Sequence, residues 1–209
     1  MKIFLLGGTG LTGRILLDEC LKISRGFEVT AFVRDSSKIK ENDEKLRVVQ
    51  GDPATAESLQ RALIGHDAVV CALGYRKPKQ RQRVFEPAIE AIVKAGTHAG
   101  IKQIVYLSAY GVAETRGDLG FLLGKLILPM MLEGVFADHA TTEKIIRSSG
   151  IDYTIVRPGM LTNGPRTGSY RAQEGLMKAR KISRADVADF MLRSLSDPSF
   201  SRKTIGLSY

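Results

Sequence analysis

KIFLLGGTGLTG, residues 2–13, joins an apolar run to a glycine-rich turn and then to a second apolar segment. The run from Ile3 to Leu6 predicts a strand, and the apolar spacing from Leu11 onward predicts a helix directly after the turn. Gly7 permits the tight turn, Gly10 allows the backbone to approach a pyrophosphate, and Gly13 allows the helix to pack on the sheet. Because the N–H groups at the start of such a helix bind anions, the expected ligand is a dinucleotide.

The glycines follow the spacing Gly-x-x-Gly-x-x-Gly, a variant of the commoner Gly-x-Gly-x-x-Gly fingerprint. Glycine-rich turns are frequent, so the spacing alone is a weak signal and a turn without a ligand is the alternative. Its position directly after a first strand favours the nucleotide site. The hydroxyls of Thr9 and Thr12 fit either interpretation, as donors to phosphate or as local backbone caps.

The composition predicts one domain with one core. The chain has 209 residues, 44% of them hydrophobic, without a break in composition, so we expect a single domain over residues 1–209. Cys20 and Cys71 have no metal-type spacing, which predicts no metal site and two packed thiols in a reducing cytoplasm. The first strand leaves no room for a signal peptide, and the apolar residues 121–132 are too few to span a bilayer.

The net charge of +9 favours anionic partners in general. One basic cluster lies within residues 76–83, where a solvated loop and a functional patch are both open interpretations. No aromatic ladder or recognised nucleic-acid motif accompanies this cluster, which makes nucleic-acid binding a minor option. We expect no membrane partner.

A second strand is predicted over residues 28–33, directly before Arg34. In dinucleotide folds an acid at this place bonds the ribose 2′-hydroxyl, whereas an arginine accommodates a 2′-phosphate. Arg34, followed closely by Ser37 and Lys38, therefore favours NADPH over NADH. Asp35 leaves an alternative open, because it could pair with Arg34 or reach the ribose itself.

The rest of the chain alternates strands with helices. Further strands are predicted over residues 47–50, 67–73, 103–107 and 152–156, and later helices from near Pro87, over 138–149 and over 183–196. This order predicts an α/β fold, a Rossmann-type doubly wound parallel sheet with helices on both faces. Residues 117–136 could form a lid, a pocket wall or a subunit contact, and residues 157–182 a small substrate-side region. Ser183 and Asp186 are placed as a capping box for the last helix.

Several polar residues follow strands at the carboxyl edge, where open α/β sheets bind ligands. Asp52 could accept from the adenine amino group or cap a helix that starts at Pro53. Ser108 could contact a ligand or cap its own strand. The turn Arg157-Pro158-Gly159 lies at the same edge.

Together these stretches resemble the atypical short-chain dehydrogenase/reductases of the NmrA-like group, and within it the biliverdin reductase B, or flavin reductase, type. The resemblance covers nearly the whole chain, including VRDSSK at 33–38 and DHATTEKIIRSSGIDY at 138–153. It implies cofactor contacts at Gly7, Thr9, Gly10, Leu11, Thr12, Arg34, Ser37, Lys38, Asp52, Pro53, Leu73, Gly74, Tyr75, Arg76, Pro158, Gly159 and Met160. The sequence departs from the flavin reductase pattern at Met160, in place of a histidine, and at Glu86, in place of a serine.

Ordinary short-chain dehydrogenases carry Tyr-x-x-x-Lys on the helix after strand five, where the lysine lowers the tyrosine pKa for proton donation. The matching positions here are Ala140 and Lys144, and the literal match from Tyr75 to Lys79 follows strand four. Without that acid, hydride transfer from NADPH to a planar acceptor needs mainly alignment, and water can supply the proton. The expected substrate is small and planar, anionic or aromatic: a flavin such as FMN or FAD, a quinone or a tetrapyrrole.

Three residues are the catalytic candidates by this resemblance: Ser108, His139 and Lys144. Ser108 would bond the substrate, His139 would contact the cofactor or act as a general acid, and Lys144 would reach the ribose or be solvated. The alternative function is an NADP(H) sensor without turnover. A sugar-nucleotide epimerase is disfavoured because the tyrosine is absent. We expect a monomer or a weak homodimer.

Overall fold

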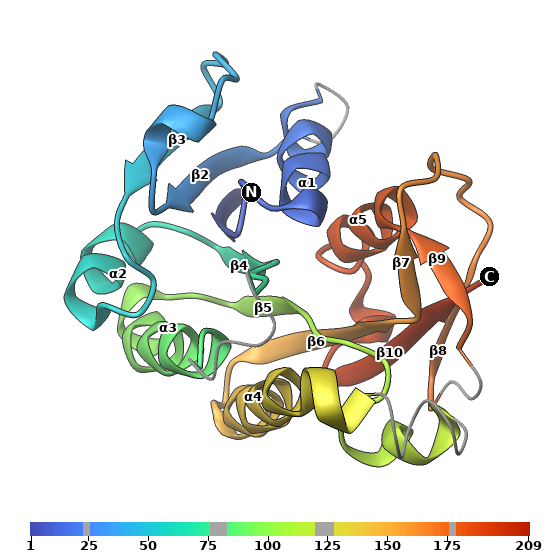
Figure 1. Ribbon diagram of the computed structural model, residues 1–209. Helices are drawn as coiled ribbons and strands as arrows, with labels where there is room; N and C mark the ends of the chain where they lie inside the picture. The colour runs from blue at the N-terminus through green and yellow to red at the C-terminus, as the bar shows by residue number, and fades with distance from the viewer. Residues whose placement is uncertain (23–25, 76–82, 120–127, 176–178) are drawn as a thin grey trace.

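The computed structural model describes residues 1–22, 26–75, 83–119, 128–175 and 179–209 (Figure 1). Within this part of the chain, eight strands form one sheet in the order β3-β2-β1-β4-β5-β6-β10-β8. They are β1 (Lys2–Leu6), β2 (Glu28–Val33), β3 (Leu46–Gln50), β4 (Ala68–Cys71), β5 (Gln103–Leu107), β6 (Asp152–Pro158), β8 (Arg171–Glu174) and β10 (Lys203–Ser208). β7 (Met160–Thr162) and β9 (Lys181–Ser183) pair in a second, small parallel sheet.

Helices cover both faces of the large sheet, with α1 and α5 on one face and α2, α3 and α4 on the other (Figure 1). Their bounds are α1 (Leu11–Leu21), α2 (Ala56–Leu63), α3 (Phe85–Ala99), α4 (Leu128–Ser148) and α5 (Arg184–Arg193). Side chains of β1 alternate between the two cores, as a strand buried on both faces requires. Ile3 and Leu5 join the core under α1 and α5, while Phe4 and Leu6 join the other. The predicted doubly wound fold is confirmed.

Short 3-10 helices connect some of these elements: η2 (Ser36–Lys38), η3 (Ala113–Leu119) and η5 (Pro198–Phe200). Both cysteines are buried, as predicted. Burial raises the pKa of the Cys71 thiol to about 12. None of the helices in the described ranges is long and apolar enough to cross a membrane.

The structure corrects several predicted boundaries. α4 begins at Leu128, not at residue 138, because Pro129 falls in its first turn, where proline is tolerated. The predicted region 117–136 is therefore divided between η3 and α4, and its residues 120–127 lie outside the described residues. α5 ends at Arg193, three residues before the predicted end, and β4 is shorter than predicted at both ends.

The sheet is not wholly parallel, because β8 pairs antiparallel to β10 at one edge. Sequence analysis missed β7, β8, β9 and β10. β7 and β9 have only three residues each, too few to show a period. β10 carried a readable signal, since Ile205 and Leu207 alternate with smaller residues and are both buried.

Candidate functional site

The turn between β1 and α1 depends on glycine at two positions. Gly7 has φ of +83°, and a Cβ there would lie 2.3 Å from the carbonyl oxygen of Ala72. A Cβ on Gly13 would lie 1.9 Å from the carbonyl oxygen of Gly7, directly after β1, so glycine at this position lets α1 lie close to the end of that strand. Gly10 is the N-cap of α1 and supplies no side-chain cap. The first turn of α1 therefore fits an anionic group.

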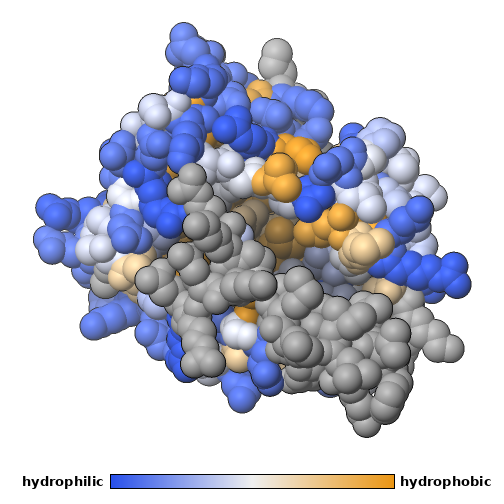
Figure 2. All heavy atoms as spheres, viewed as in Figure 1, coloured by the Kyte–Doolittle hydropathy of each residue, from blue (hydrophilic) through white to orange (hydrophobic). Residues whose placement is uncertain are grey.

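A cavity of about 1130 Å³ lies at the carboxyl ends of β1, β2, β4 and β5. Its volume is slightly above the usual range for ligand pockets, roughly 300–1,000 Å³. Figure 2 shows hydrophobic residues gathered around a hollow in the middle of the face in view. The lining residues are Gly7, Thr9, Gly10, Leu11, Thr12, Phe32, Val33, Arg34, Asp35, Lys38, Pro53, Ala72, Leu73, Gly74, Tyr75, Phe85, Leu107, Ser108, Ala109, Val135, His139, Leu161 and Arg184.

Most of the predicted cofactor contacts meet at this cavity. Those that line it are Gly7, Thr9, Gly10, Leu11, Thr12, Arg34, Lys38, Pro53, Leu73, Gly74 and Tyr75. Ser37 and Asp52 do not line it. Each makes a local bond: the Ser37 hydroxyl donates to Asp35, and the Asp52 carboxylate accepts from the N–H of Ala54. Arg76 lies outside the described residues.

The polar groups after β2 are arranged around Asp35. Its carboxylate accepts a hydrogen bond from Ser37 and pairs with the Lys38 ammonium at 3.3 Å, and these hydrogen bonds lower the pKa of Asp35. Arg34 is exposed on the cavity wall. No carboxylate of the described residues lies within ion-pair distance of Arg34. The alternative in which Asp35 neutralises Arg34 is thus not observed.

The turn from Pro158 to Met160 does not line the cavity. The N–H of Gly159 donates to Leu207, and the N–H of Met160 donates to Arg180. These backbone bonds commit the turn to the neighbouring strands, and the Met160 side chain is 70% exposed. Leu161, which the sequence analysis did not select, lines the cavity instead, since successive side chains of a strand point to opposite sides.

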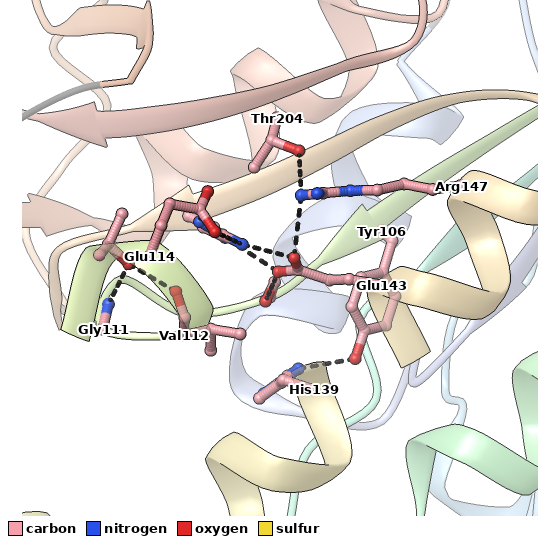
Figure 3. A network of polar contacts seen from close by, with 11 residues as sticks. Tyr106, Gly111, Val112, Glu114, His139, Glu143, Arg147 and Thr204 are labelled. Atoms are coloured by element: carbon pink, nitrogen blue, oxygen red, sulfur yellow. Dashed lines mark hydrogen bonds and ion pairs between the residues drawn. The ribbon is translucent and has the colours of Figure 1, made fainter. Parts of the chain in front are cut away.

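Ser108 lies at the cavity wall and belongs to a buried charged network (Figure 3). Its hydroxyl donates to Glu143 Oε1 at 2.7 Å. Arg157 donates to both oxygens of Glu143, at 2.9 and 2.5 Å, and to Glu114 at 2.6 Å. Arg147 adds a bond to Glu143 at 3.2 Å. The sequence analysis missed Glu143, although this residue lies directly before Lys144 in the segment 138–153 that carries the resemblance.

Lys144 is not part of the site. It is exposed and does not line the cavity, whereas its neighbour Glu143 is buried. Consecutive residues of an α-helix point about 100° apart, since a turn takes about 3.6 residues, and here Glu143 faces inward while Lys144 faces solvent. The predicted ribose contact of Lys144 is therefore not supported by its position.

His139 lines the cavity but is almost fully buried. Its ring stacks on Phe85 with centroids 4.2 Å apart, and its Nδ1 lies 2.6 Å from the hydroxyl of Tyr106. Burial lowers the pKa of His139 to about 3. The imidazole is therefore neutral near pH 7, which argues against the general-acid alternative.

The Tyr75 hydroxyl also donates its hydrogen bond within the protein. Its hydroxyl donates to Asp138 Oδ2 at 2.6 Å, and burial raises the Tyr75 pKa. Asp138 accepts further bonds from the N–H groups of Val84, Phe85 and Glu86 at 2.8–3.0 Å. A carboxylate from α4 thus caps the start of α3, a role that no local spacing could indicate.

Arg184 is a second cavity residue that the sequence analysis missed. It is the first residue of α5, after the capping Ser183, whose hydroxyl accepts from the N–H of Asp186 as predicted. One guanidinium nitrogen of Arg184 donates to Asn163 Oδ1 at 2.7 Å. Among described residues, no carboxylate pairs with it. No described cluster of His, Cys, Asp or Glu could hold a metal ion.

Comparison with known proteins is consistent with this site. Residues 7–198 match the family described as NAD(P)H-binding. An uncharacterized chloroplastic protein of Arabidopsis thaliana is 33% identical over 98% of this chain and 75% of its own length. An uncharacterized sugar epimerase of Bacillus subtilis is 28% identical, with coverage of 100% and 94%. Quinone oxidoreductase 2 of Escherichia coli is 26% identical, with coverage of 99% and 68%.

The solved structure of ChuY, an anaerobillin reductase from Escherichia coli O157:H7, has a TM-score of 0.82 at 19% identity. The match covers 100% of this chain and 97% of that one, and at this identity it shows the fold alone. The fold is thus one that reductases share. With a family match over most of its length and the glycine turn at the head of α1, the chain belongs to the NAD(P)H-binding family.

Proposed function

We propose that this protein is an NADPH-dependent oxidoreductase that reduces a planar acceptor without a protein acid. One observation carries the proposal: none of the described titratable or hydroxyl side chains around the middle of the cavity is placed to act as an acid. Ser108 donates to Glu143, Tyr75 donates to Asp138, and His139 is neutral. A carbonyl substrate needs an acid for its developing alkoxide, and the acid contributes a factor of roughly 10²–10⁴.

The residues after β1 and β2 fit the cofactor. The uncapped first turn of α1 would hold the pyrophosphate, and Arg34 with Lys38 would hold the 2′-phosphate of NADPH. When bound, NADPH supplies the hydride, and water supplies the proton that completes reduction of the acceptor. The chain's own part is to orient the acceptor and to exclude water from the buried wall formed by Phe85 and His139.

An anionic group on the acceptor would find a partner in Arg184. This guanidinium lines the cavity, and only one of its nitrogens has a hydrogen bond to a described residue. Arginine binds phosphate or carboxylate through two parallel N–H donors. A phosphate-bearing flavin or a tetrapyrrole carboxylate therefore suits the cavity better than a neutral ring.

The names of relatives support reductase chemistry in part. Quinone oxidoreductase 2 acts on a planar acceptor by its name, and the ChuY fold is that of an anaerobillin reductase. Another relative is named a sugar epimerase. We disfavour epimerisation here because the matching place for the acid tyrosine holds Ala140 on α4.

The alternative is an NADP(H) sensor that binds without turnover, which the same shortage of proton donors favours. NADPH oxidation by purified protein, with FMN, riboflavin, menadione or biliverdin added in turn, separates the two. Oxidation that requires an added acceptor supports the reductase, and NADPH binding without oxidation by any acceptor supports the sensor. Failure to bind either NADPH or NADH contradicts both.

A further inference from the structure

Ser108 lines the cavity, and its hydroxyl hydrogen points away from the cavity toward Glu143. We infer that Ser108 acts as an acceptor, and that the planar substrate presents a ring N–H to it, as a flavin or a linear tetrapyrrole does and a quinone does not. The inference rests on the proposed reduction of a planar acceptor, and it narrows the substrate to N–H-bearing rings. Glu143 is then a positioning residue that acts through Ser108.

The proton between Ser108 and Glu143 belongs to the Ser108 hydroxyl. Among the described residues, every group that contacts the Glu143 carboxylate other than Ser108 is an arginine N–H donor, from Arg157 and Arg147. A carboxylate held by two guanidinium groups has no proton of its own to give, so the hydroxyl hydrogen of Ser108 must point toward Glu143. Hydrogen bonds to a charged acceptor are roughly twice as strong as neutral ones.

The Glu143 side chain cannot turn away from Ser108. Its side chain is 3% exposed, and the Arg157 side chain that grips both of its oxygens is 2% exposed. Arg157 is held in turn by Glu114. Arg147 is held by Thr204, as Figure 3 shows. The carboxylate is therefore anchored on every side by residues of α4, β6, β10 and η3.

The Ser108 hydroxyl oxygen is the atom that a ligand in the cavity would meet. A serine oxygen has two lone pairs beside its one O–H, and Ser108 lines the cavity wall. Its backbone N–H donates to Val156, which holds the residue in place. The group offered to a ligand is consequently a lone pair. An N–H satisfies that lone pair, whereas a quinone oxygen would face it with another acceptor.

The test compares lumiflavin with 3-methyllumiflavin, which has the same ring but a methyl group in place of the N3 hydrogen. Binding to the NADP⁺-saturated protein is followed by quenching of flavin fluorescence, so the readout does not depend on turnover. We expect wild type to bind lumiflavin roughly tenfold more tightly. Ser108→Ala should remove the preference by weakening lumiflavin. If the change came only from tighter 3-methyllumiflavin binding, the methyl contact would be steric and the inference would be wrong.

Glu143→Gln tests the positioning role, because a neutral amide no longer fixes the direction of the Ser108 hydroxyl. The preference for lumiflavin should fall, while Thr204→Ala, at the outer end of the same network, should keep it. Thermal melting confirms that each variant is folded. An unchanged preference in folded Glu143→Gln contradicts the positioning role.

Two further outcomes overturn the inference. Wild type that binds both flavins equally shows that Ser108 receives no ring N–H. A Ser108→Ala protein that loses NADP⁺ affinity as much as lumiflavin affinity shows that Ser108 contacts the cofactor. The proposed function fails separately, if wild type prefers lumiflavin but oxidises no NADPH with it.

Discussion

The cavity has two halves that are built by different means. The nucleotide half consists of the glycine turn and exposed cations, namely residues 7–12, Arg34 and Lys38. The acceptor half consists of buried or half-buried side chains, namely Tyr75, Ser108 and His139. In the nucleotide half the backbone itself offers the donors, whereas in the acceptor half each polar side chain is already bonded to another residue.

The two halves also differ in how far along the chain their contacts reach. Lys38 and Asp35 are three residues apart, and Gly10 bonds the carbonyl of Gly7 within the same turn. Ser108 and Glu143 are 35 residues apart, and Tyr75 and Asp138 are 63 apart. The nucleotide half should therefore tolerate loss of a side chain with a change in affinity, while the acceptor half should lose stability.

The largest effect is expected from Arg157→Leu. The substitution leaves the Glu143 carboxylate buried and without its main partner, and breaking a buried pair in this way costs about 3–5 kcal/mol of unfolding free energy. Urea denaturation measures the loss. The matched control is Arg61→Ala, which breaks an exposed pair with Glu57 on α2 and should cost less than about 1 kcal/mol. Similar losses in both variants would mean that the buried pair behind Ser108 stabilises the protein no more than an exposed pair does.

Arg34→Ala should change affinity and not stability. Loss of a hydrogen-bonded charge on the 2′-phosphate should weaken NADPH by about 1.5–3 kcal/mol and leave NADH nearly unchanged. Calorimetric titration with each cofactor gives the difference, and Arg61→Ala again serves as the control for net charge. Equal weakening of both cofactors would remove Arg34 from the 2′-phosphate site.

Gly13→Ala tests whether the nucleotide half depends on backbone shape. The new Cβ would lie 1.9 Å from the Gly7 carbonyl oxygen, and forced overpacking of this kind costs about 1–3 kcal/mol. Urea denaturation and NADPH binding should both be impaired. Gly134→Ala, at an exposed position of α4 with open space around it, should instead stabilise the protein by up to about 1 kcal/mol. A stabilised Gly13→Ala protein would contradict the geometry of the turn.

The same difference explains what the sequence could and could not predict. The glycine turn, Arg34 and Lys38 act through neighbours in the chain, so their spacing indicated both the fold and the nucleotide half. Glu143 and Asp138 contact the cavity residues Ser108 and Tyr75, and Arg184 lines the cavity itself, only through folding of distant segments. No local pattern marks them. Lys144 was selected by its match to a family position, but the helix turns it to solvent and turns Glu143 inward.

His139 gives the acceptor half a dependence on pH between pH 7 and pH 5, above the acidic range in which Asp35 of the nucleotide half titrates. The folded His139 pKa of about 3 lies below the ordinary value of 6.5, so the unfolded chain binds the proton first as pH falls. The stability it contributes is complete above pH 6.5 and is lost progressively below it. From pH 7 to pH 5 the loss of unfolding free energy should be about 2 kcal/mol.

His66, whose pKa burial also lowers, adds to the pH dependence of the wild-type stability. Urea denaturation of His139→Gln, which keeps an acceptor for Tyr106, isolates the share of His139: the variant should lose about 2 kcal/mol less than wild type over this range. Parallel pH profiles for the two proteins would mean that His139 does not remain neutral in the folded state.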